Sequence, residues 1–438
     1  MLSDVERTPL DGWVAARLGG AGRDEIARWQ LERLRETLAW AGRRSRWYAE
    51  RLAGVGEIAS LSELPRVPFT TPEDLRQRGA EMLCVSQAEV ARVVTFQSSG
   101  TTGAPKRVFF TVAEQEATVD FFAHGMSTLV GRGDRVLILL PGATPGSVGA
   151  LLASALERIG ARPIPHGFVR DLPEAAAVLR RERPTSLVGV PVHALALARF
   201  AEASGVAPAP RTALLSTDHV PRCVVAELRR IWGCQVFEHY GMTEMALGGA
   251  VECAAHDGCH VRELDLLVEV VDPVTGAPSP PGALGEIVFT TLTRRAMPLI
   301  RYRTGDVSRV RPGRCACGSS LLRLERLGAR RSALRLPGGA TLCDLDEALF
   351  AIPGVIDFTA AADPVRVPTR LSIVLRALGV RGQAGAERVI DALTRIAALR
   401  RARRDGELEI DVVEERAATL FSTGAAKRVL APSRAIAA

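Results

Sequence analysis

The chain has 438 residues, of which 47% are hydrophobic and 24% are charged, and its formal net charge is +7. This composition is typical of a folded globular protein, and the length predicts two domains. The positive charge is modest and its arginines are scattered along helical patterns, so we expect no nucleic-acid partner. No apolar run is long enough to span a membrane and the first residues are polar, so we expect a cytoplasmic protein with no membrane partner. Its eight cysteines are then thiols or metal ligands rather than disulfides.

The predicted elements begin with a helix over residues 24–54 and a capped helix start at 71–75. Between residues 93 and 240, strand patterns alternate with helical patterns, which predicts parallel sheets covered by helices and ligands beyond the carboxyl ends of the strands. The strands are 136–140, 186–190, 212–216 and 235–237, and the helices are 149–159, 192–204 and 222–232. Residues 261–310 are strand-rich. Residues 329–438 resemble a small α/β domain, with helices at 345–349 and 387–399 and strands at 371–375 and 408–412.

A loop of hydroxyls and glycines joins two strand patterns, at 93–96 and 107–111. It consists of Ser98-Ser99-Gly100-Thr101-Thr102-Gly103-Ala104-Pro105-Lys106. Glycines let several N–H groups converge on one anion, the hydroxyls add donors and the lysine adds a positive charge. The loop is therefore a candidate phosphate cradle, although it lacks the Gly-Lys-Ser/Thr of a Walker loop. A polar hairpin loop is the alternative.

Two further motifs follow in the chain, Glu238-His239-Tyr240-Gly241-Met242-Thr243-Glu244 and Arg301-Tyr302-Arg303-Thr304-Gly305-Asp306. Together with the loop, they resemble the core motifs of the adenylate-forming (AMP-binding) superfamily of acyl-CoA synthetases, and residues 285–306 resemble its phenylacetate-CoA ligase branch. The resemblance covers residues 25–326. It implies an α/β fold with a large N-terminal adenylate-forming domain over 1–327, which has parallel sheets flanked by helices and a β-rich subdomain. A small, mobile α/β C-terminal domain would occupy 328–438.

The resemblance also implies which residues would hold the adenosine part of ATP or AMP. Tyr240 would stack on the adenine, with Gly241 as a further nucleotide-binding residue, and Asp218 or the neighbouring backbone would face the adenine edge. Asp306 would accept hydrogen bonds from the ribose hydroxyls, with Arg303 nearby. These roles suit the residue types, because an aromatic face matches a purine and a carboxylate matches a diol.

The phosphate end of the nucleotide would meet the loop. Residues 98–103 and Lys106 would hold the phosphates, and Thr243 would contact the α-phosphate. Glu244 would bind Mg²⁺ beside the phosphate oxygens, as carboxylates commonly do. Thr243 and Glu244 are thus the expected catalytic residues of this motif.

Three segments would line an acyl pocket, at 120–126, 141–148 and 191–193. They are rich in glycine and alanine and carry few charges. Small side chains leave room for a flat, apolar acid, so aromatic or short branched acids fit, but ordinary packing of small residues against helices explains the same composition. His124, Gly142 and His219 are the candidate pocket residues.

A group of cysteines and histidines on two loops, 253–260 and 315–317, has the ligand types of a closed zinc site. We expect Cys253, His260, Cys315 and Cys317 to bind one structural Zn²⁺, with Cys259 as the rival of His260. The pattern also resembles a zinc site found in parts of the phenylacetate-CoA ligase branch. Free thiols on loops are the alternative, although such close exposed thiols would be prone to oxidation.

The chain departs from the family pattern in its last third. The Gly-Arg-x-Asp-Asp hinge of the family corresponds to Gly328-Ala329-Arg330-Arg331-Ser332, so Ala329 replaces the arginine, although Arg330 could substitute for it. The late Gly-Lys-x-x-Arg-Val corresponds to residues 424–429, so Ala425 replaces the adenylation lysine. Lys427 is the nearest substitute and the third expected catalytic residue, although two residues along a strand is about 7 Å.

The resemblance implies a ligase that activates a small carboxylic acid with Mg·ATP to an acyl-adenylate and transfers the acyl group to CoA or to the phosphopantetheine of a carrier protein. Because Ala425 replaces the lysine, an ATP-independent acyltransferase between acyl-CoA and a carrier protein is a second hypothesis. A non-catalytic nucleotide-binding subunit is a third. The expected cofactors are ATP/AMP, Mg²⁺, CoA or phosphopantetheine, and structural Zn²⁺. The sequence leaves a homodimer open.

Overall fold

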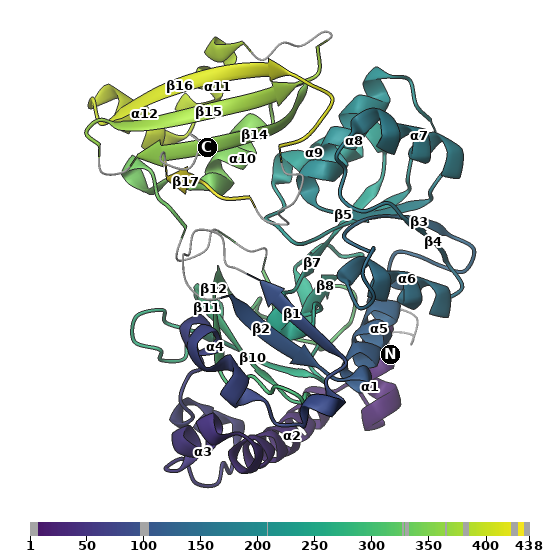
Figure 1. The fold of residues 1–438 in the computed structure, drawn as a ribbon, viewed down its shortest axis with the longest axis vertical. Helices are drawn as coiled ribbons and strands as arrows, with labels where there is room; N and C mark the ends of the chain where they lie inside the picture. The colour runs from purple at the N-terminus through teal and green to yellow at the C-terminus, as the bar shows by residue number, and fades with distance from the viewer. Residues whose placement is uncertain are drawn as a thin grey trace. The chain divides into compact units, whose positions relative to one another are not determined.

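The computed structural model describes residues 8–96, 105–207, 209–325, 328, 333–363, 366–379, 385–421 and 428–432. These residues form two compact units (Figure 1). Unit 1 draws on Met1–Thr128 and His239–Gly328, and unit 2 on Leu129–Glu238 and Ala329–Ala438. The α/β fold that the sequence predicts is confirmed. No helix in the described ranges combines the length and the apolar character needed to cross a bilayer.

Capped helices surround the core of unit 1. Thr8, Thr71 and Thr111 each cap a helix and form a capping box with an acidic residue three positions on, which confirms the predicted helix start at 71–75. The single helix predicted over 24–54 is divided at Ser45, whose extended backbone ends one helix and whose hydroxyl caps the next. The α-helices are α1 (Pro9–Leu18), α2 (Arg23–Arg44), α3 (Arg46–Leu52), α4 (Pro72–Arg78) and α5 (Val112–Met126). The 3-10 turns are η2 (Leu61–Arg66), η3 (Gly79–Met82), η4 (Gln87–Glu89) and η5 (Thr243–Met245).

Antiparallel strands form the rest of unit 1. Strands β1 (Arg92–Phe96) and β2 (Lys106–Phe110) pair as a hairpin around the candidate phosphate loop, with Phe96 opposite Lys106. Strands β10 (Leu266–Val271), β11 (Gly285–Thr291) and β12 (Tyr302–Ser308) form a three-stranded sheet. Strands β8 (Ala250–Glu252), β9 (Cys259–Val261) and β13 (Arg323–Leu324) continue from the end of β7 (Gln235–Tyr240). One apolar core joins α2 and α3 to these strands and includes Tyr240 and Tyr302.

Unit 2 contains the predicted parallel sheet, with the strand order β4-β3-β5-β6-β7. Its inner strands β3, β5 and β6 are almost completely buried because helices cover them, which explains their continuous apolar sequences, whereas the edge strand β4 is partly exposed. The strands besides β7 are β3 (Arg135–Leu139), β4 (Arg162–Pro165), β5 (Ser186–Gly189) and β6 (Thr212–Leu215). The helices are α6 (Val148–Arg158), α7 (Leu172–Glu182), α8 (Pro191–Ala203) and α9 (Arg222–Trp232).

The C-terminal segment adds a four-stranded sheet of order β16-β15-β14-β17 to unit 2. The predicted helix 387–399 is two helices, because the backbone of Ile396 is extended. The elements are η6 (Pro337–Gly339), α10 (Leu342–Leu349), β14 (Val355–Asp363), β15 (Thr369–Ala377), α11 (Ala386–Thr394), α12 (Ala397–Arg404), β16 (Leu408–Arg416) and β17 (Ala431–Pro432).

Specific hydrogen bonds hold this segment against α8 and α9. The buried guanidinium of Arg199 donates to the carbonyl oxygens of Phe350 at 2.8 Å and Ile352 at 3.0 Å. The carboxylate of Glu347 accepts from the first backbone N–H groups of α9, at 2.7 and 3.0 Å. These contacts explain why the C-terminal segment and Leu129–Glu238 form one compact unit. The division into domains 1–327 and 328–438, and the mobility of the latter, stay predictions.

Candidate nucleotide site and metal centre

The carboxylate of Glu244 is the centre of the candidate nucleotide site in unit 1. It lies in η5, directly after β7, and its side chain is 2% exposed. The Nζ of Lys106 lies 2.5 Å from its Oε1, and the hydroxyl of Tyr302 donates to the same oxygen at 3.0 Å. A carboxylate removed from water needs such partners, since an unpaired buried charge is strongly unfavourable. Glu244 is therefore a fixed anion beside the end of the candidate phosphate loop.

Strand β12 connects the second and third sequence motifs. Alternation along the strand puts Tyr302, Thr304 and Asp306 on one face. From this face, Tyr302 reaches Glu244, and the carboxylate of Asp306 accepts a hydrogen bond from the hydroxyl of Tyr240 at 3.1 Å. The structure thus brings Lys106, Tyr240, Glu244 and Asp306 together. Sequence reasoning missed Tyr302, although its four-residue separation from Asp306 in a strand pattern placed both on one face.

Other predicted nucleotide residues have different surroundings. Arg303 lies on the opposite face of β12, where its guanidinium donates to Glu286 at 3.0 Å and to the carbonyl of Pro273 at 2.7 Å. Asp218 belongs to unit 2, where one carboxylate oxygen accepts from the N–H of Arg428 at 3.0 Å. The nucleotide roles of Arg303 and Asp218 stay predictions. Residues 98–103, Ala329, Ala425 and Lys427 lie outside the described residues.

The backbone around Glu244 is held tightly. Ala246 and Leu247 have φ angles of 55° and 69°, a conformation that side chains disfavour and that surrounding contacts must maintain. Arg294, which sequence reasoning also missed, donates to the carbonyl of Glu244 at 3.0 Å. A Cβ atom on Gly241 would lie 2.1 Å from the carbonyl oxygen of Leu247. The motif thus needs glycine at 241 because two backbone segments meet there.

Gly241→Ala is therefore expected to lower the free energy of unfolding by about 1–3 kcal/mol and to weaken AMP binding, because the backbone before Glu244 must move. Gly12→Ala is the matched control: it is a helical glycine with no atom within 4 Å of an added Cβ, and alanine there favours the helix by about 1 kcal/mol. Thermal unfolding and calorimetry with AMP would measure both effects. Equal behaviour of the two variants would contradict the close approach at Gly241.

The candidate acyl-pocket residues divide between the units. His124 is in α5 of unit 1, and its Nδ1 lies 2.8 Å from the carbonyl oxygen of Asp120. Gly142 and His219 belong to unit 2. His239, which sequence reasoning did not select for the pocket, has its ring edge-on to Phe122 at 6.2 Å. Burial lowers the pKa of His239 to about 4, so its imidazole is neutral at neutral pH. The pocket roles of His124, Gly142 and His219 stay predictions.

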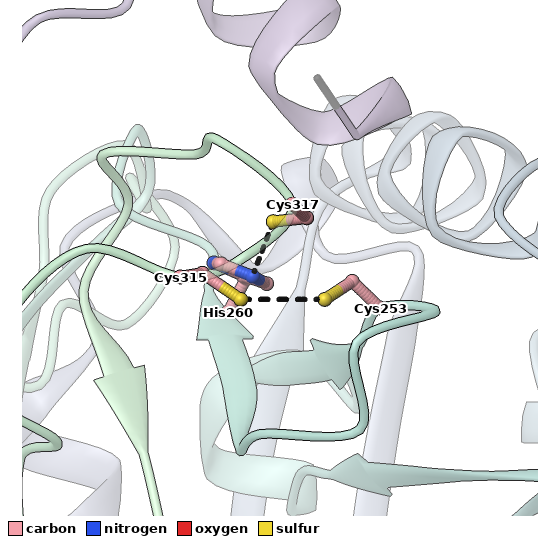
Figure 2. A group of neighbouring side chains, drawn as sticks. All are labelled: Cys253, His260, Cys315 and Cys317. Atoms are coloured by element: carbon pink, nitrogen blue, oxygen red, sulfur yellow. Dashed lines mark hydrogen bonds between the residues drawn. The ribbon is translucent and has the colours of Figure 1, made fainter. Parts of the chain in front are cut away.

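The four predicted zinc ligands converge in unit 1 (Figure 2). Cys253 follows β8, His260 is in β9, and Cys315 and Cys317 lie on the loop between β12 and β13. Their ligand atoms all lie within 4.8 Å of one another. The Sγ atoms of Cys253 and Cys315 are 3.6 Å apart, and Cys317 Sγ is 3.4 Å from His260 Nε2. A tetrahedral Zn²⁺ with ordinary bond lengths has edges of about 3.8 Å between sulfurs and about 3.6 Å between sulfur and nitrogen.

The protonation chemistry of this cluster also fits a metal. Burial raises the pKa values of the Cys253 and Cys317 thiols and lowers the pKa of His260, so without a cation these two thiols keep their protons. A divalent cation would stabilise the thiolates and bind the neutral imidazole. The rival, Cys259, precedes His260 in β9 and therefore points to the other face, where it belongs to the apolar core. The geometry favours His260 over Cys259 as the fourth ligand.

Comparisons with known proteins show the family to which the chain belongs. Residues 71–292 match the model of the AMP-binding enzyme family. The chain is 33% identical to a phenylacetate-coenzyme A ligase of Pseudomonas putida over 329 residues, which is 72% of each protein. It is 31% identical to a phenylacetate-coenzyme A ligase of Thermus thermophilus over 347 residues, which is 76% of this chain and 77% of that one.

The chain belongs to the AMP-binding enzyme family, and within it to the phenylacetate-CoA ligase-like branch of AMP-forming acid–thiol ligases. A crystal structure of 2-hydroxyisobutyryl-CoA ligase in the postadenylation state has the same fold, with a TM-score of 0.80 at 20% identity over all of this chain and 94% of that one. The anthranilate CoA ligase AuaEII aligns with a TM-score of 0.53 over 76% of this chain and 64% of that one, at 17% identity. The predicted family is confirmed.

Proposed function

We propose that this enzyme activates a small aromatic carboxylic acid with Mg·ATP and transfers the acyl group to CoA or to a carrier-protein thiol. The proposal rests on two hydrogen bonds made from one face of β12, one between Tyr302 and Glu244 and one between Asp306 and Tyr240. Through β12, these contacts link the carboxylate of Glu244, which is of a kind that binds Mg²⁺, to the aromatic ring of Tyr240 and to the carboxylate of Asp306, which is of a kind that binds ribose. A nucleotide needs these three groups together.

The chemistry has two steps. In the first, a carboxylate oxygen of the acid attacks the α-phosphorus of ATP, and the bond to the β-phosphate oxygen breaks to release pyrophosphate. In the second, a thiolate sulfur attacks the acyl carbon, and AMP leaves with the electrons of the carbon–oxygen bond. Both transition states place additional negative charge near the phosphorus or the acyl oxygen, where fixed cations lower the barrier.

The residues around Glu244 suit the first step. Lys106 supplies an ammonium that can move from Glu244 to phosphate oxygens when the nucleotide enters. Mg²⁺ bound by Glu244 would neutralise charge on the phosphate oxygens and the leaving pyrophosphate. Thr243 would orient the α-phosphate, Tyr240 would stack on the adenine and Asp306 would bind the ribose. We assign the acid to the side of His239 and Phe122, because a neutral imidazole and a phenyl ring suit an apolar aromatic acid.

We further propose that Cys253, His260, Cys315 and Cys317 bind one Zn²⁺ with a structural role. Four protein ligands leave no open position, which is typical of structural rather than catalytic zinc. The metal would fasten the loop that follows the Glu244 motif to the loop that follows β12. These two loops follow the segments that carry Glu244 and Asp306, so zinc would help to maintain the separation of the two carboxylates.

An ATP-independent acyltransferase that uses the same fold is the second candidate, and Ala425 is the observation that favours it. A lysine directed at developing negative charge is worth roughly 10²–10³ in rate. Wild type is therefore expected to release pyrophosphate slowly with acids such as phenylacetate and benzoate. Exchange of a preformed acyl-CoA with a carrier thiol would then be the faster reaction.

Ala425→Lys is expected to raise acid-dependent pyrophosphate release roughly 10²-fold, because it restores a cation at the family's position. Ala426→Lys is the matched control, with the same charge one residue further on, and it should leave the rate unchanged. A coupled pyrophosphate assay with each acid measures all three proteins. Wild-type release at ordinary ligase rates, of order 1–10³ per second, would reject the acyltransferase and assign the role to Lys427 or another cation.

A further inference from the structure

A basic depression lies at the amino ends of the parallel strands of unit 2. It has a volume of about 560 Å³, and five arginines line it together with Glu182. Arg135 and Arg162 begin β3 and β4, and Arg211 directly precedes β6. Arg181 lies in the last turn of α7, and Arg183 caps that helix before β5. The depression is thus at the amino end of β6, whereas Asp218 follows the carboxyl end of that strand, and it shares no residue with the candidate nucleotide site.

Hydrogen bonds from Arg135 hold the backbone that surrounds this depression. The guanidinium of Arg135 donates to the carbonyl of Glu182 at 3.0 Å and to the carbonyl of Arg183 at 2.9 and 2.7 Å. The N–H of Arg135 also donates to the hydroxyl of Thr185 at 2.9 Å. These bonds join the end of α7 to the start of β3. The remaining arginines therefore project from a fixed base rather than from a long loop.

The charges of this depression are unbalanced. Glu182 pairs with Arg162 at 2.9 Å and with Arg181 at 3.0 Å, and Asp134 pairs with Arg211 at 2.5 Å. Five guanidinium groups therefore face two carboxylates, an excess of three positive charges. The paired arginine side chains are 65%, 66% and 71% exposed, and exposed ion pairs of this kind are weak. A stronger anion can redirect these guanidinium groups with little loss.

Arg183 adds an independent observation, because its backbone is left-handed, with φ 48° and ψ 57°. This conformation at a helix C-terminus favours glycine. Two other helices of the chain, α1 and α9, end in this way at Gly19 and Gly233. The chain thus has an arginine at a position where glycine would be more stable. A strained residue that projects a cation into a basic depression indicates a function for that side chain.

We propose that this depression binds a compact ligand that carries two or more phosphate groups. Guanidinium forks bind phosphate oxygens in pairs, and several of them together match a polyphosphate better than a single carboxylate. The volume is that of a site for a cofactor-sized molecule. The basic residues form one local group interrupted by acids, whereas a nucleic-acid backbone needs an extended basic track. Inorganic polyphosphate and a nucleoside polyphosphate share the chemistry that the site recognises.

Calorimetry with inorganic tripolyphosphate and with ADP tests the proposal in the full chain. The variant Arg162→Glu/Arg211→Glu reverses two charges of the depression, and Arg28→Glu/Arg43→Glu reverses two exposed charges of α2 as the matched control. The first variant is expected to lose affinity for tripolyphosphate at least roughly tenfold, and the control to retain wild-type affinity. If ADP shows the larger loss, the ligand is a nucleoside polyphosphate; if tripolyphosphate does, the phosphates alone are recognised.

Equal losses in both variants would mean a general charge effect and would overturn the proposal. Tight binding of poly-aspartate or of a single-stranded RNA oligomer, lost in the same variant, would replace it with an acidic protein or a nucleic acid. Arg183→Gly tests ligand binding separately from folding, because glycine should stabilise the fold while the loss of the guanidinium should weaken the binding of the ligand. This variant is expected to raise the thermal midpoint and to weaken tripolyphosphate binding. A raised midpoint with unchanged affinity would overturn the role of Arg183.

Discussion

Glu244→Gln is expected to decrease acyl-adenylate formation on the order of 10²–10³-fold and to destabilise unit 1. Glutamine keeps a hydrogen-bond acceptor for Tyr302 but removes the charge that pairs with Lys106. The ammonium of Lys106, whose side chain is 9% exposed, is then buried without its counter-charge. Removing one partner of a buried ion pair costs about 3–5 kcal/mol. The variant should therefore unfold at a lower denaturant concentration than wild type.

The double variant Lys106→Met/Glu244→Gln separates the two effects. It removes both charges, and replacing a buried ion pair with uncharged side chains is often neutral for stability. We therefore expect the unfolding transition to return toward that of wild type, while pyrophosphate release stays at the low rate. Urea unfolding and the pyrophosphate assay on wild type, the single variants Glu244→Gln and Lys106→Met, and the double variant complete the cycle. If the double variant regains activity with stability, Glu244 acts only through packing and is no magnesium ligand.

Cys315→Ser is expected to remove about one equivalent of zinc per chain. Loss of a structural metal couples directly to folding, and a cost on the order of 3 kcal/mol would lower the thermal midpoint by about 6–12 °C. Cys259→Ala, which changes the rival residue on the other face of β9, should retain zinc. Elemental analysis gives the metal content and calorimetry the midpoint. Full zinc content in Cys315→Ser, or zinc loss in Cys259→Ala, would show that the ligand set is wrong.

A chelator experiment keeps this prediction testable if Cys315→Ser does not fold. Chemical modification of the thiols of wild type should release the metal in one step, and titration with a coloured zinc indicator measures the released metal. The released zinc should reach about one equivalent per chain, and thermal stability should fall in parallel. If wild-type protein purified in the presence of zinc contains none, the three thiols and the imidazole of the cluster do not bind this metal.

The order of elements could be read from the sequence because local patterns carry it. Buried parallel strands are short, continuous apolar runs, and β3, β5, β6 and β7 all occur where such runs were expected. Strands β1 and β2 were predicted from the patterns on either side of the glycine-rich loop, but their antiparallel pairing comes from the structure, which also shows β1 to be partly exposed rather than buried. The predicted helix over 24–54 was wrong at one place, because a serine in an apolar periodicity does not reveal that Ser45 ends one helix and caps the next.

Candidate site residues could be predicted from the sequence only where their residue types are distinctive. Lys106, Tyr240, Glu244 and Asp306 are distinctive because their side chains match parts of a nucleotide, and the structure brings these four together. The cysteines and histidines are distinctive because few other residues bind zinc. Only the tertiary structure shows which of the neighbours Cys259 and His260 lies in the cysteine and histidine cluster. Alternation in β9 separates His260 from Cys259.

Long-range packing decided the rest. Tyr302 rather than Arg303 meets Glu244, because pairing of β11 with β12 fixes which face of β12 turns inward. The grouping of the C-terminal segment with Leu129–Glu238 depends on Arg199 and Glu347, whose partners are more than 100 residues away in the chain. The basic depression likewise forms only when parallel pairing aligns the starts of several strands. A sequence pattern indicates which residues share a face of a strand or helix, but only the packed structure determines which residues that face contacts.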